Sequence, residues 1–235
     1  MRLDNFWRSK RWAEYERAYG DAPGTRSALL ADNRWATRVV DLSVEPSRLW
    51  AGVRRSYHSP INRATREFDA IGDRVDGQSA WRSVLIGPGA GGLIRTAQRL
   101  HLFDAGRQTR PDETWDLLGD WADDGGGLLS MAWDASITAR SSGARGDDGS
   151  SFSPAIGFAY FIIDGEWAYY ASAATVIGSL NASLVWWAIQ ALKARGVRWC
   201  EMGWQGQATD EKGQAIEFFR RGFGGVDVPF TKELE

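Results

Sequence analysis

The sequence AIGFAYFIIDGEWAYYASAAT, residues 155–175, is typical of two β-strands joined by a tight turn. Apolar, β-branched and aromatic side chains dominate both arms, and such residues favour extended backbone. Asp164-Gly165 separates the arms, and an Asp-Gly pair between two apolar runs is a strong indication of a two-residue hairpin turn. We therefore predict strands over 155–163 and 167–175.

The residues that follow predict a helix, a strand, a second helix and a final strand. Apolar residues recur at helical spacing from Leu184 to Leu192, and Gly196 stands where a left-handed C-terminal cap belongs. Beyond this helix we expect a strand over 197–202, a helix over 214–221 and a strand over 227–234. A hairpin followed by helix, strand, helix and strand indicates a layered α/β (α+β) domain.

Upstream of the hairpin the pattern is more helical. We expect helices over 6–19, 45–57, 61–68, 93–103 and 114–121, and strands over 27–31, 37–42, 81–86 and 128–133. Ser59-Pro60 has the form of an N-cap followed by proline at the first helical position, so we place a helix start there. Residues 140–153 are rich in Gly, Ser and Asp and are expected to form a mobile loop.

The composition is that of an ordinary globular protein. The 235 residues include 28 Lys and Arg against 30 Asp and Glu, and a net charge of −2 gives no overall attraction to nucleic acid or to an anionic membrane. One cysteine cannot form an internal disulfide, and two histidines cannot build a multi-histidine metal centre. The N-terminal residues are too charged for a signal peptide, and no apolar run approaches ~18 residues. We therefore expect a soluble, cytoplasmic protein.

Two clusters of arginines are candidates for binding an anionic group, because a guanidinium binds phosphate or carboxylate through two parallel hydrogen bonds. Between Arg48 and Arg66 there are five arginines and no acidic residue. A solvated helix face explains this first cluster equally well. The second cluster, LHLFDAGRQTRPDETW at 100–115, places Arg107 and Arg110 three residues apart, close in sequence to a histidine and a tryptophan.

Two other features are not interpreted as functional sites. GPGAGG at 87–92 matches the GxGxxG pattern of dinucleotide-binding loops, but no second βαβ unit and no strand ending in an acidic residue follow it. We therefore expect a glycine-rich turn. Cys200 lies within an apolar strand and is interpreted as an inert core thiol.

Three stretches resemble, in order and spacing, motifs of the FemAB-like branch of the GNAT acyltransferase superfamily. ASLVWWAIQALKARGVRWCEMGW (182–204), followed by KGQAIEFFRRGFGG (212–225), is similar to a helix ending in Gly, a strand ending in Asp-Leu-Gly and the pattern Ile-x-x-Phe-Lys-x-x-Phe-Gly. RRSYHSPINRA (54–64) resembles an Arg-Lys-Ser-Tyr-Arg-x-x-Ile-x-x-Ala helix. Residues 100–115 resemble a His-x-x-x-x-Gly-Arg-x-Thr-Arg-x-x-x-Thr-Trp run.

The resemblance implies a mixed, mostly antiparallel sheet flanked by helices. It implies a single domain over 1–235, with a helical and hairpin N-terminal part over 1–80 and the GNAT core over 128–235. It further implies transfer of an acyl or aminoacyl group, without a metal, from acyl-CoA or aminoacyl-tRNA to an amine. The acceptor would be an amino sugar, a nucleotide-linked sugar, a peptide or another polymer. The protein would act as a monomer or homodimer, with tRNA as its nucleic-acid partner.

The same resemblance suggests roles for individual residues. Glu201 is the candidate base or acceptor-positioning carboxylate, although a structural carboxylate paired with a nearby arginine explains it equally well. Arg220 stabilises negative charge, Tyr170 donates a proton to the leaving group, and His101 is a further catalytic candidate. The candidate substrate-binding residues are Arg55, Arg63, Arg107, Arg110, Trp115 and Tyr169, and the candidate donor-binding residues are Gly178, Ser179 and Asn181.

The chain departs from the family pattern at two functionally important places. Residues 176–182 lack the Arg/Gln-x-x-Gly-x-Gly/Ala loop with which ordinary GNAT enzymes cradle CoA, and Arg220 stands where the family has Lys. Arginine still stabilises negative charge but is a poor proton donor. A non-catalytic ligand-binding protein on a GNAT-like scaffold is therefore the alternative hypothesis.

Overall fold

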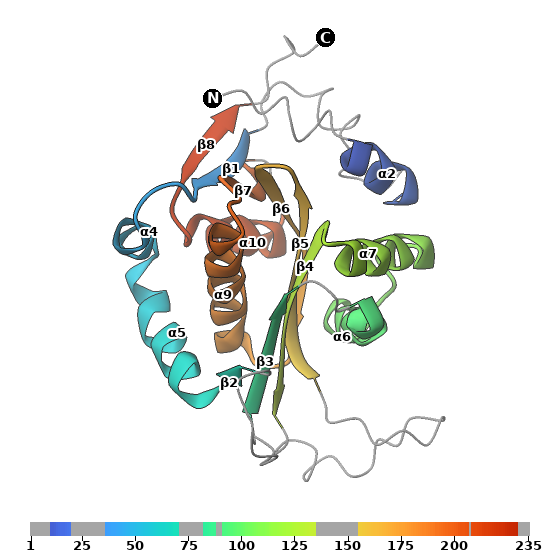
Figure 1. The fold of residues 1–235 in the computed structure, drawn as a ribbon, viewed down its shortest axis with the longest axis horizontal. Helices are drawn as coiled ribbons and strands as arrows, with labels where there is room; N and C mark the ends of the chain where they lie inside the picture. The colour runs from blue at the N-terminus through green and yellow to red at the C-terminus, as the bar shows by residue number, and fades with distance from the viewer. Residues whose placement is uncertain are drawn as a thin grey trace.

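One mixed sheet runs through the part of the chain that the computed structural model describes, namely residues 10–19, 36–70, 82–87, 91–134, 155–206 and 208–229. Within these ranges the sheet has eight strands in the order β2-β3-β4-β5-β6-β7-β1-β8 (Figure 1). The strands are β1 (Ala36–Asp41), β2 (Asp69–Ala70), β3 (Arg82–Gly87), β4 (Gly127–Asp134), β5 (Ala155–Asp164), β6 (Trp167–Thr175), β7 (Trp199–Gln205) and β8 (Val226–Pro229).

Helices cover both faces of this sheet (Figure 1). The α-helices are α2 (Lys10–Tyr19), α4 (Pro46–Gly52), α5 (Arg55–Glu67), α6 (Ile94–Ala105), α7 (Asp112–Asp124), α9 (Asn181–Ala194) and α10 (Glu211–Arg221), with short 3-10 turns η1 (Gly91–Leu93) and η2 (Gly178–Leu180). One hydrophobic core lies between the sheet and α4, α5 and α9, and another lies between the sheet and α2, α6 and α7. No helix of the described residues is long and apolar enough to pass through a bilayer.

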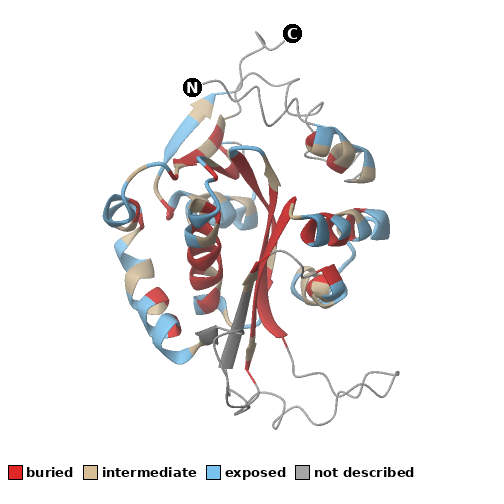
Figure 2. Ribbon diagram, in the orientation of Figure 1, coloured by how far each residue is buried: buried red, intermediate tan, exposed pale blue. Residues whose placement is uncertain are grey.

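Helix α9 is the most deeply buried helix (Figure 2). Its residues from Ala182 to Ile189 are all buried, because the helix is apolar on every side and lies between the sheet and α5. The first turn of α9 therefore has a fixed position relative to the end of β6.

Strands β6 and β7 are parallel to each other, and their pairing is short. It joins only Trp167–Tyr169 to Trp199–Glu201, although both strands continue for several residues beyond. The other neighbours in the sheet run antiparallel, except β2 and β3.

Each of these two strands carries an extra residue just beyond the paired part. Ala171 is inserted in β6 relative to β5, and Met202 is inserted in β7 relative to β1. An inserted residue bends the strand and increases its twist. Both strands bend away from each other just beyond their paired residues. Among the described strands, the facing edges of β6 and β7 have no pairing partner from there on.

The sequence predictions of the fold are largely confirmed. The sheet is mixed and mostly antiparallel with helices on its faces, β6 has the predicted bounds, and Gly165 in the hairpin turn has a φ of 56°. Gly196 follows α9 with a φ of 82°, as predicted for a left-handed cap. β3, which precedes the glycine-rich run, is antiparallel to β4, whereas a dinucleotide-binding loop belongs to a parallel βαβ unit.

The helix start predicted at Ser59-Pro60 is wrong. The expected helix over 45–57 is interrupted before Arg54, and α5 begins at Arg55 with Pro60 in its interior. The Arg54 backbone N–H donates to the carbonyl of Gly222 at 2.7 Å, and this contact holds Arg54 extended. A distant segment of the chain therefore decides where the helix begins.

Several predicted segments fall outside the described residues. The strand expected over 27–31 and the loop expected over 140–153 lie there, as do the outer ends of the elements expected over 6–19 and 227–234.

Candidate functional site

The candidate site lies where β6 and β7 stop pairing. We call it the β6–β7 opening and define it by Tyr169 and Tyr170 on β6, Glu201 on β7, Arg110 between α6 and α7, and Arg220 on α10. The charges of Arg110 and Arg220 both act on the two tyrosines, so both guanidinium groups lie at this level of the sheet.

Arg110 is fastened to the bend of β6. Its Nη1 donates to Ser172 Oγ at 2.5 Å and its Nη2 to the carbonyl of the inserted Ala171 at 2.6 Å. Its guanidinium also lies 5.5 Å from the ring centre of the buried Trp115. Both terminal nitrogens of Arg110 thus hold the strand, and the guanidinium adds a positive charge to the opening.

Arg220 approaches β7 at a glycine. Gly203 has a φ of 99°, a conformation that side chains other than glycine rarely adopt, and a Cβ atom placed there would lie 2.8 Å from Arg220 Cζ. Arg220 donates one long hydrogen bond of 3.5 Å to the carbonyl of Trp204 and forms no ion pair with any described residue. Its positive charge is therefore not neutralised by a neighbouring carboxylate of the described chain.

Glu201 is completely buried on the β7 side of the opening. Its Oε1 accepts a hydrogen bond from Thr37 Oγ1 on β1 at 2.5 Å. A buried carboxylate needs such donors to offset its loss of hydration. Thr37 fixes the direction of this carboxyl group relative to the sheet.

The two tyrosines retain their protons at neutral pH. Burial raises the pKa of both Tyr169 and Tyr170, and the nearby guanidinium groups offset this only partly. Their side chains point to opposite faces of the sheet, since they are consecutive in a strand. Tyr169 packs at 5.0 Å edge-on to Trp12, whereas the Tyr170 hydroxyl has no hydrogen-bond partner among the described residues. The register that pairs Tyr169 with Glu201 places these two side chains on one face of the sheet, and Tyr170 packs in the core on the α9 side.

His101 on α6 lies beside the opening as a neutral imidazole. Burial, and after it the positive charges of Arg110 and Lys212, lower its pKa to about 4. The ring makes an edge contact with Trp115 at 5.5 Å and lies 3.4 Å from Thr109 Oγ1. Because Lys212 belongs to α10, the start of α10 lies within electrostatic range of His101.

We predict that the protein loses stability in acid through His101. The pKa of histidine is about 6.5 in the unfolded chain and about 4 in the fold. Below pH 6.5 the unfolded state therefore binds a proton that the folded state does not. This contribution to stability is complete above pH 6.5 and is lost as the pH falls toward 4. Denaturant unfolding at several pH values checks it: His101→Gln should flatten the curve between pH 6.5 and 4, and an unchanged curve would contradict the prediction.

Three of the predicted arginines lie outside the opening. Arg55, Arg63 and Arg107 are all exposed, and none of them makes an ion pair or a hydrogen bond with a described residue. Arg107 follows α6, and Arg55 is the first residue of α5. They remain available to a ligand, but the fold does not gather them around Glu201.

The predicted donor-binding residues lie at the start of α9. Gly178 and Ser179 form the exposed turn η2, and the Oδ1 atom of Asn181 is buried without a hydrogen-bond partner. A cavity of about 270 Å³ beside this turn is lined by residues including Ser179, Arg63 and two carboxylates, Glu67 and Asp134. The cavity therefore has no excess of positive charge.

Sequence reasoning missed the residues that shape the opening. Thr37, Ala171 and Ser172 carry no pattern of their own, because their roles arise only when distant elements meet. Gly203 belongs to the quoted motif, yet its positive φ shows only in the structure. The described residues contain no group of three or more His, Cys, Asp or Glu side chains arranged to hold a metal ion.

Comparisons with known proteins give structural but not sequence relatives. No protein-family model matches the sequence, and no curated protein matches it. The structure is similar to that of FemX, with a TM-score of 0.57 and 10% identity over 83% of this chain and 60% of FemX. The C-terminal domain of a putative lysylphosphatidylglycerol synthetase from Agrobacterium fabrum follows at a TM-score of 0.49 and 11% identity, over 85% of this chain and 61% of that one.

The chain thus spans about 60% of the length of FemX. At 10% identity the similarity concerns the fold, and it agrees with the resemblance predicted from the three sequence motifs. The protein has the GNAT-like fold that FemX also has.

Proposed function

We propose that the chain is an acyl- or aminoacyltransferase. It moves the group from a phosphate-bearing donor, acyl-CoA or aminoacyl-tRNA, to an amine of an amino sugar, a nucleotide-linked sugar, a peptide or another polymer. The observation that carries the proposal is the β6–β7 opening, where an unpaired strand edge, a buried carboxylate, an unpaired guanidinium and a protonated tyrosine meet.

Each of these groups suits one requirement of acyl transfer. Beyond Tyr169 the edge of β6 that faces β7 has backbone groups without a strand partner, and a donor can hydrogen-bond to them. The amine attacks the donor carbonyl and loses a proton to Glu201. Arg220 stabilises the negative charge that develops on the carbonyl oxygen, and Tyr170 protonates the leaving thiolate or alkoxide.

The donor phosphates are assigned to the turn before α9. A helix start offers unpaired backbone N–H groups and the positive end of the helix dipole, so Gly178, Ser179 and Asn181 suit a phosphate. The exposed Arg63 lines the same 270 Å³ cavity as Ser179 and supplies a further donor.

The acceptor is assigned to the side of the opening formed by α6 and α7. Arg110 and Trp115 hold this wall in place, Tyr169 closes its base, and the exposed Arg107 lies at the connection between the helices. Arg55 on α5 is available to an extended acceptor or to tRNA.

We expect a true donor to raise the melting temperature of the protein. A ligand at about 100 times its Kd adds ~2.7 kcal/mol to the stability, which corresponds to about 5–10 °C for a chain of this size. Thermal-shift measurements with acetyl-CoA, longer acyl-CoAs, free CoA and charged tRNA check this. Uncharged tRNA is the control for nucleic-acid binding without an acyl group. Failure of every donor to shift the transition would contradict the proposal.

Non-catalytic ligand binding is the second candidate function. Two observations favour it: Glu201 is completely buried, and both terminal nitrogens of Arg110 donate hydrogen bonds to β6. The two functions differ in the behaviour of Glu201→Gln and Arg220→Ala. Loss of turnover with retained affinity indicates an enzyme, whereas loss of affinity in both variants indicates a binding protein.

A further inference from the structure

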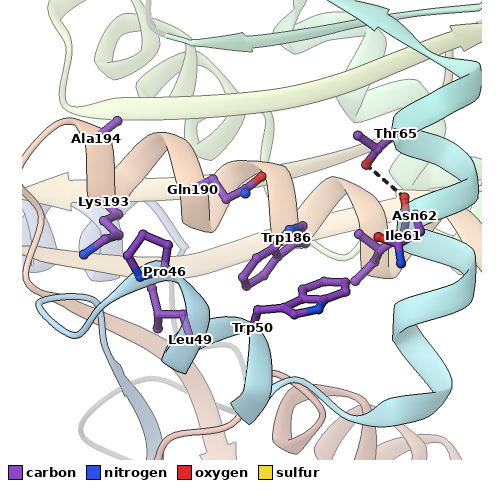
Figure 3. A pocket seen from close by; sticks show the side chains of 10 residues that line it. All are labelled: Pro46, Leu49, Trp50, Ile61, Asn62, Thr65, Trp186, Gln190, Lys193 and Ala194. Carbon is purple, nitrogen blue, oxygen red and sulfur yellow. Dashed lines mark hydrogen bonds between the residues drawn. The ribbon is translucent and has the colours of Figure 1, made fainter.

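A second cavity lies on the opposite side of the sheet from α6 and α7, between α4, α5 and α9 (Figure 3). Its volume is about 530 Å³, within the range of small-molecule sites. It shares no lining residue with the β6–β7 opening. Its lining includes apolar side chains and amide groups, among them Leu49, Trp50, Ile61, Trp186, Asn62 and Gln190.

Two tryptophans form the aromatic part of this wall. The rings of Trp50 and Trp186 lie 5.1 Å apart and are tilted by 54°, so together they present an angled apolar surface (Figure 3). His58 stacks on Trp50 at 4.1 Å with an interplanar angle of 19° and holds this ring in place. Trp186 is itself buried, so the half-buried Trp50 supplies the more accessible ring, and His58 and Trp186 both pack against it.

Two amide side chains lie beside these rings, and neither forms a hydrogen bond with a described residue. They are Asn62 on α5 and Gln190 on α9, and both are exposed. In Figure 3 they lie on different sides of Trp186. An amide offers both donors and an acceptor, and this suits a ligand that carries hydroxyl groups.

The positive charge that lines the cavity already has hydrogen-bond partners in the protein. Lys193 is the only charged residue among the described residues that line it, and its ammonium group donates to the carbonyls of Leu42 at 2.7 Å and Val44 at 2.8 Å. The described lining residues include no carboxylate. A phosphate or carboxylate ligand would therefore find no free cation among them, and a cationic ligand would find no anion.

We propose that this cavity binds an uncharged saccharide. The apolar C–H face of a pyranose packs against the indole surface, and its hydroxyl groups bond to the Asn62 and Gln190 amides. An alkyl chain fits the observations less well, since it offers neither amide a hydrogen-bond partner. The inference rests on the cavity alone and does not depend on the proposed acyl transfer.

The test is titration of the full chain with cellobiose, maltose and N,N′-diacetylchitobiose, followed by calorimetry and by saturation-transfer NMR. We expect saturable binding of at least one of them. Trp50→Ala should weaken it about tenfold, the equivalent of ~1.4 kcal/mol. Asn62→Ala and Gln190→Ala should each weaken it about fivefold, because each removes one hydrogen bond.

The amide variants keep the test valid if Trp50→Ala fails to fold, because both amides are exposed and neither side chain makes a hydrogen bond to a described residue. Gln214→Ala, an exposed amide on α10, is the matched control and should bind as the unaltered chain does. No saturable binding of the three disaccharides overturns the proposal. The proposal is also overturned if Trp50→Ala, Asn62→Ala and Gln190→Ala all bind the saccharide as tightly as the unaltered chain does. It is overturned as well if the cavity binds decanol but no saccharide.

Discussion

Replacing Glu201 with glutamine is expected to reduce turnover by about 10²- to 10⁴-fold, the range found when a general base is removed. Glutamine has nearly the same shape, and its amide oxygen can still accept the hydrogen bond that Thr37 Oγ1 gives to Glu201. The variant should therefore fold and bind its donor, but it has no carboxylate to accept a proton from the attacking amine. Steady-state kinetics, once a donor has been identified by thermal shift, measure the change.

Thr37→Val is the companion variant that separates chemistry from positioning. It leaves the carboxylate in place but removes the hydroxyl that orients it, at a cost of ~1.5–3 kcal/mol in stability for a hydrogen bond to a charged group. We expect Thr37→Val to lower stability more than Glu201→Gln does and to lower turnover less. Glu201→Gln with the turnover of the unaltered protein would refute the assignment of Glu201 as base.

Gly203→Ala is expected to impair both stability and catalysis. Alanine at a φ of 99° is strained by ~1–3 kcal/mol, and its Cβ would lie 2.8 Å from Arg220 Cζ. Arg220 must therefore move away from β7. Since one stabiliser of developing negative charge is worth about 10²- to 10³-fold in rate, turnover should fall by about that factor.

Gly206→Ala is the matched control for this substitution. Gly206 has a similar φ of 91°, but a Cβ there would meet no atom within 4 Å. Both variants carry the backbone strain, and only Gly203→Ala displaces Arg220. Chemical denaturation and kinetics of the two should show comparable losses of stability but different losses of rate. Equal rates would exclude a catalytic role for the close approach of Arg220 to β7.

Those parts of the fold that depend on neighbouring residues were predictable. The hairpin from β5 to β6 follows from two apolar runs around Asp164-Gly165, and α9 follows from a helical apolar repeat that ends before Gly196. The boundary between α4 and α5 was not predictable, because the Arg54 guanidinium donates to the carbonyl of Phe218, 164 positions away, and its N–H to that of Gly222. The local Ser59-Pro60 signal is weaker than these contacts.

The candidate site was predictable only in its residue types. The motif resemblance pointed to Glu201, Arg220, Tyr170 and Arg110, and the fold brings all four to the β6–β7 opening. The sequence did not indicate the inserted residues Ala171 and Met202 that part the strands, since an insertion is defined by the partner strand. It also gave no sign that Arg110 binds the strand.

The position of β1 between β7 and β8 has a consequence for how the protein is made. β1 is hydrogen-bonded on both edges to strands that the ribosome synthesises more than 150 residues later. Thr37 and its hydrogen-bond partner Glu201 are 164 residues apart in the sequence. Contacts of such long sequence separation close slowly, because the entropy of a large loop must be lost before they form. During synthesis the hairpin and α9 have their local partners early, whereas Glu201 acquires its partner Thr37 only when β1 docks. The nascent chain thus acquires the geometry of the candidate site in one of the last steps of folding.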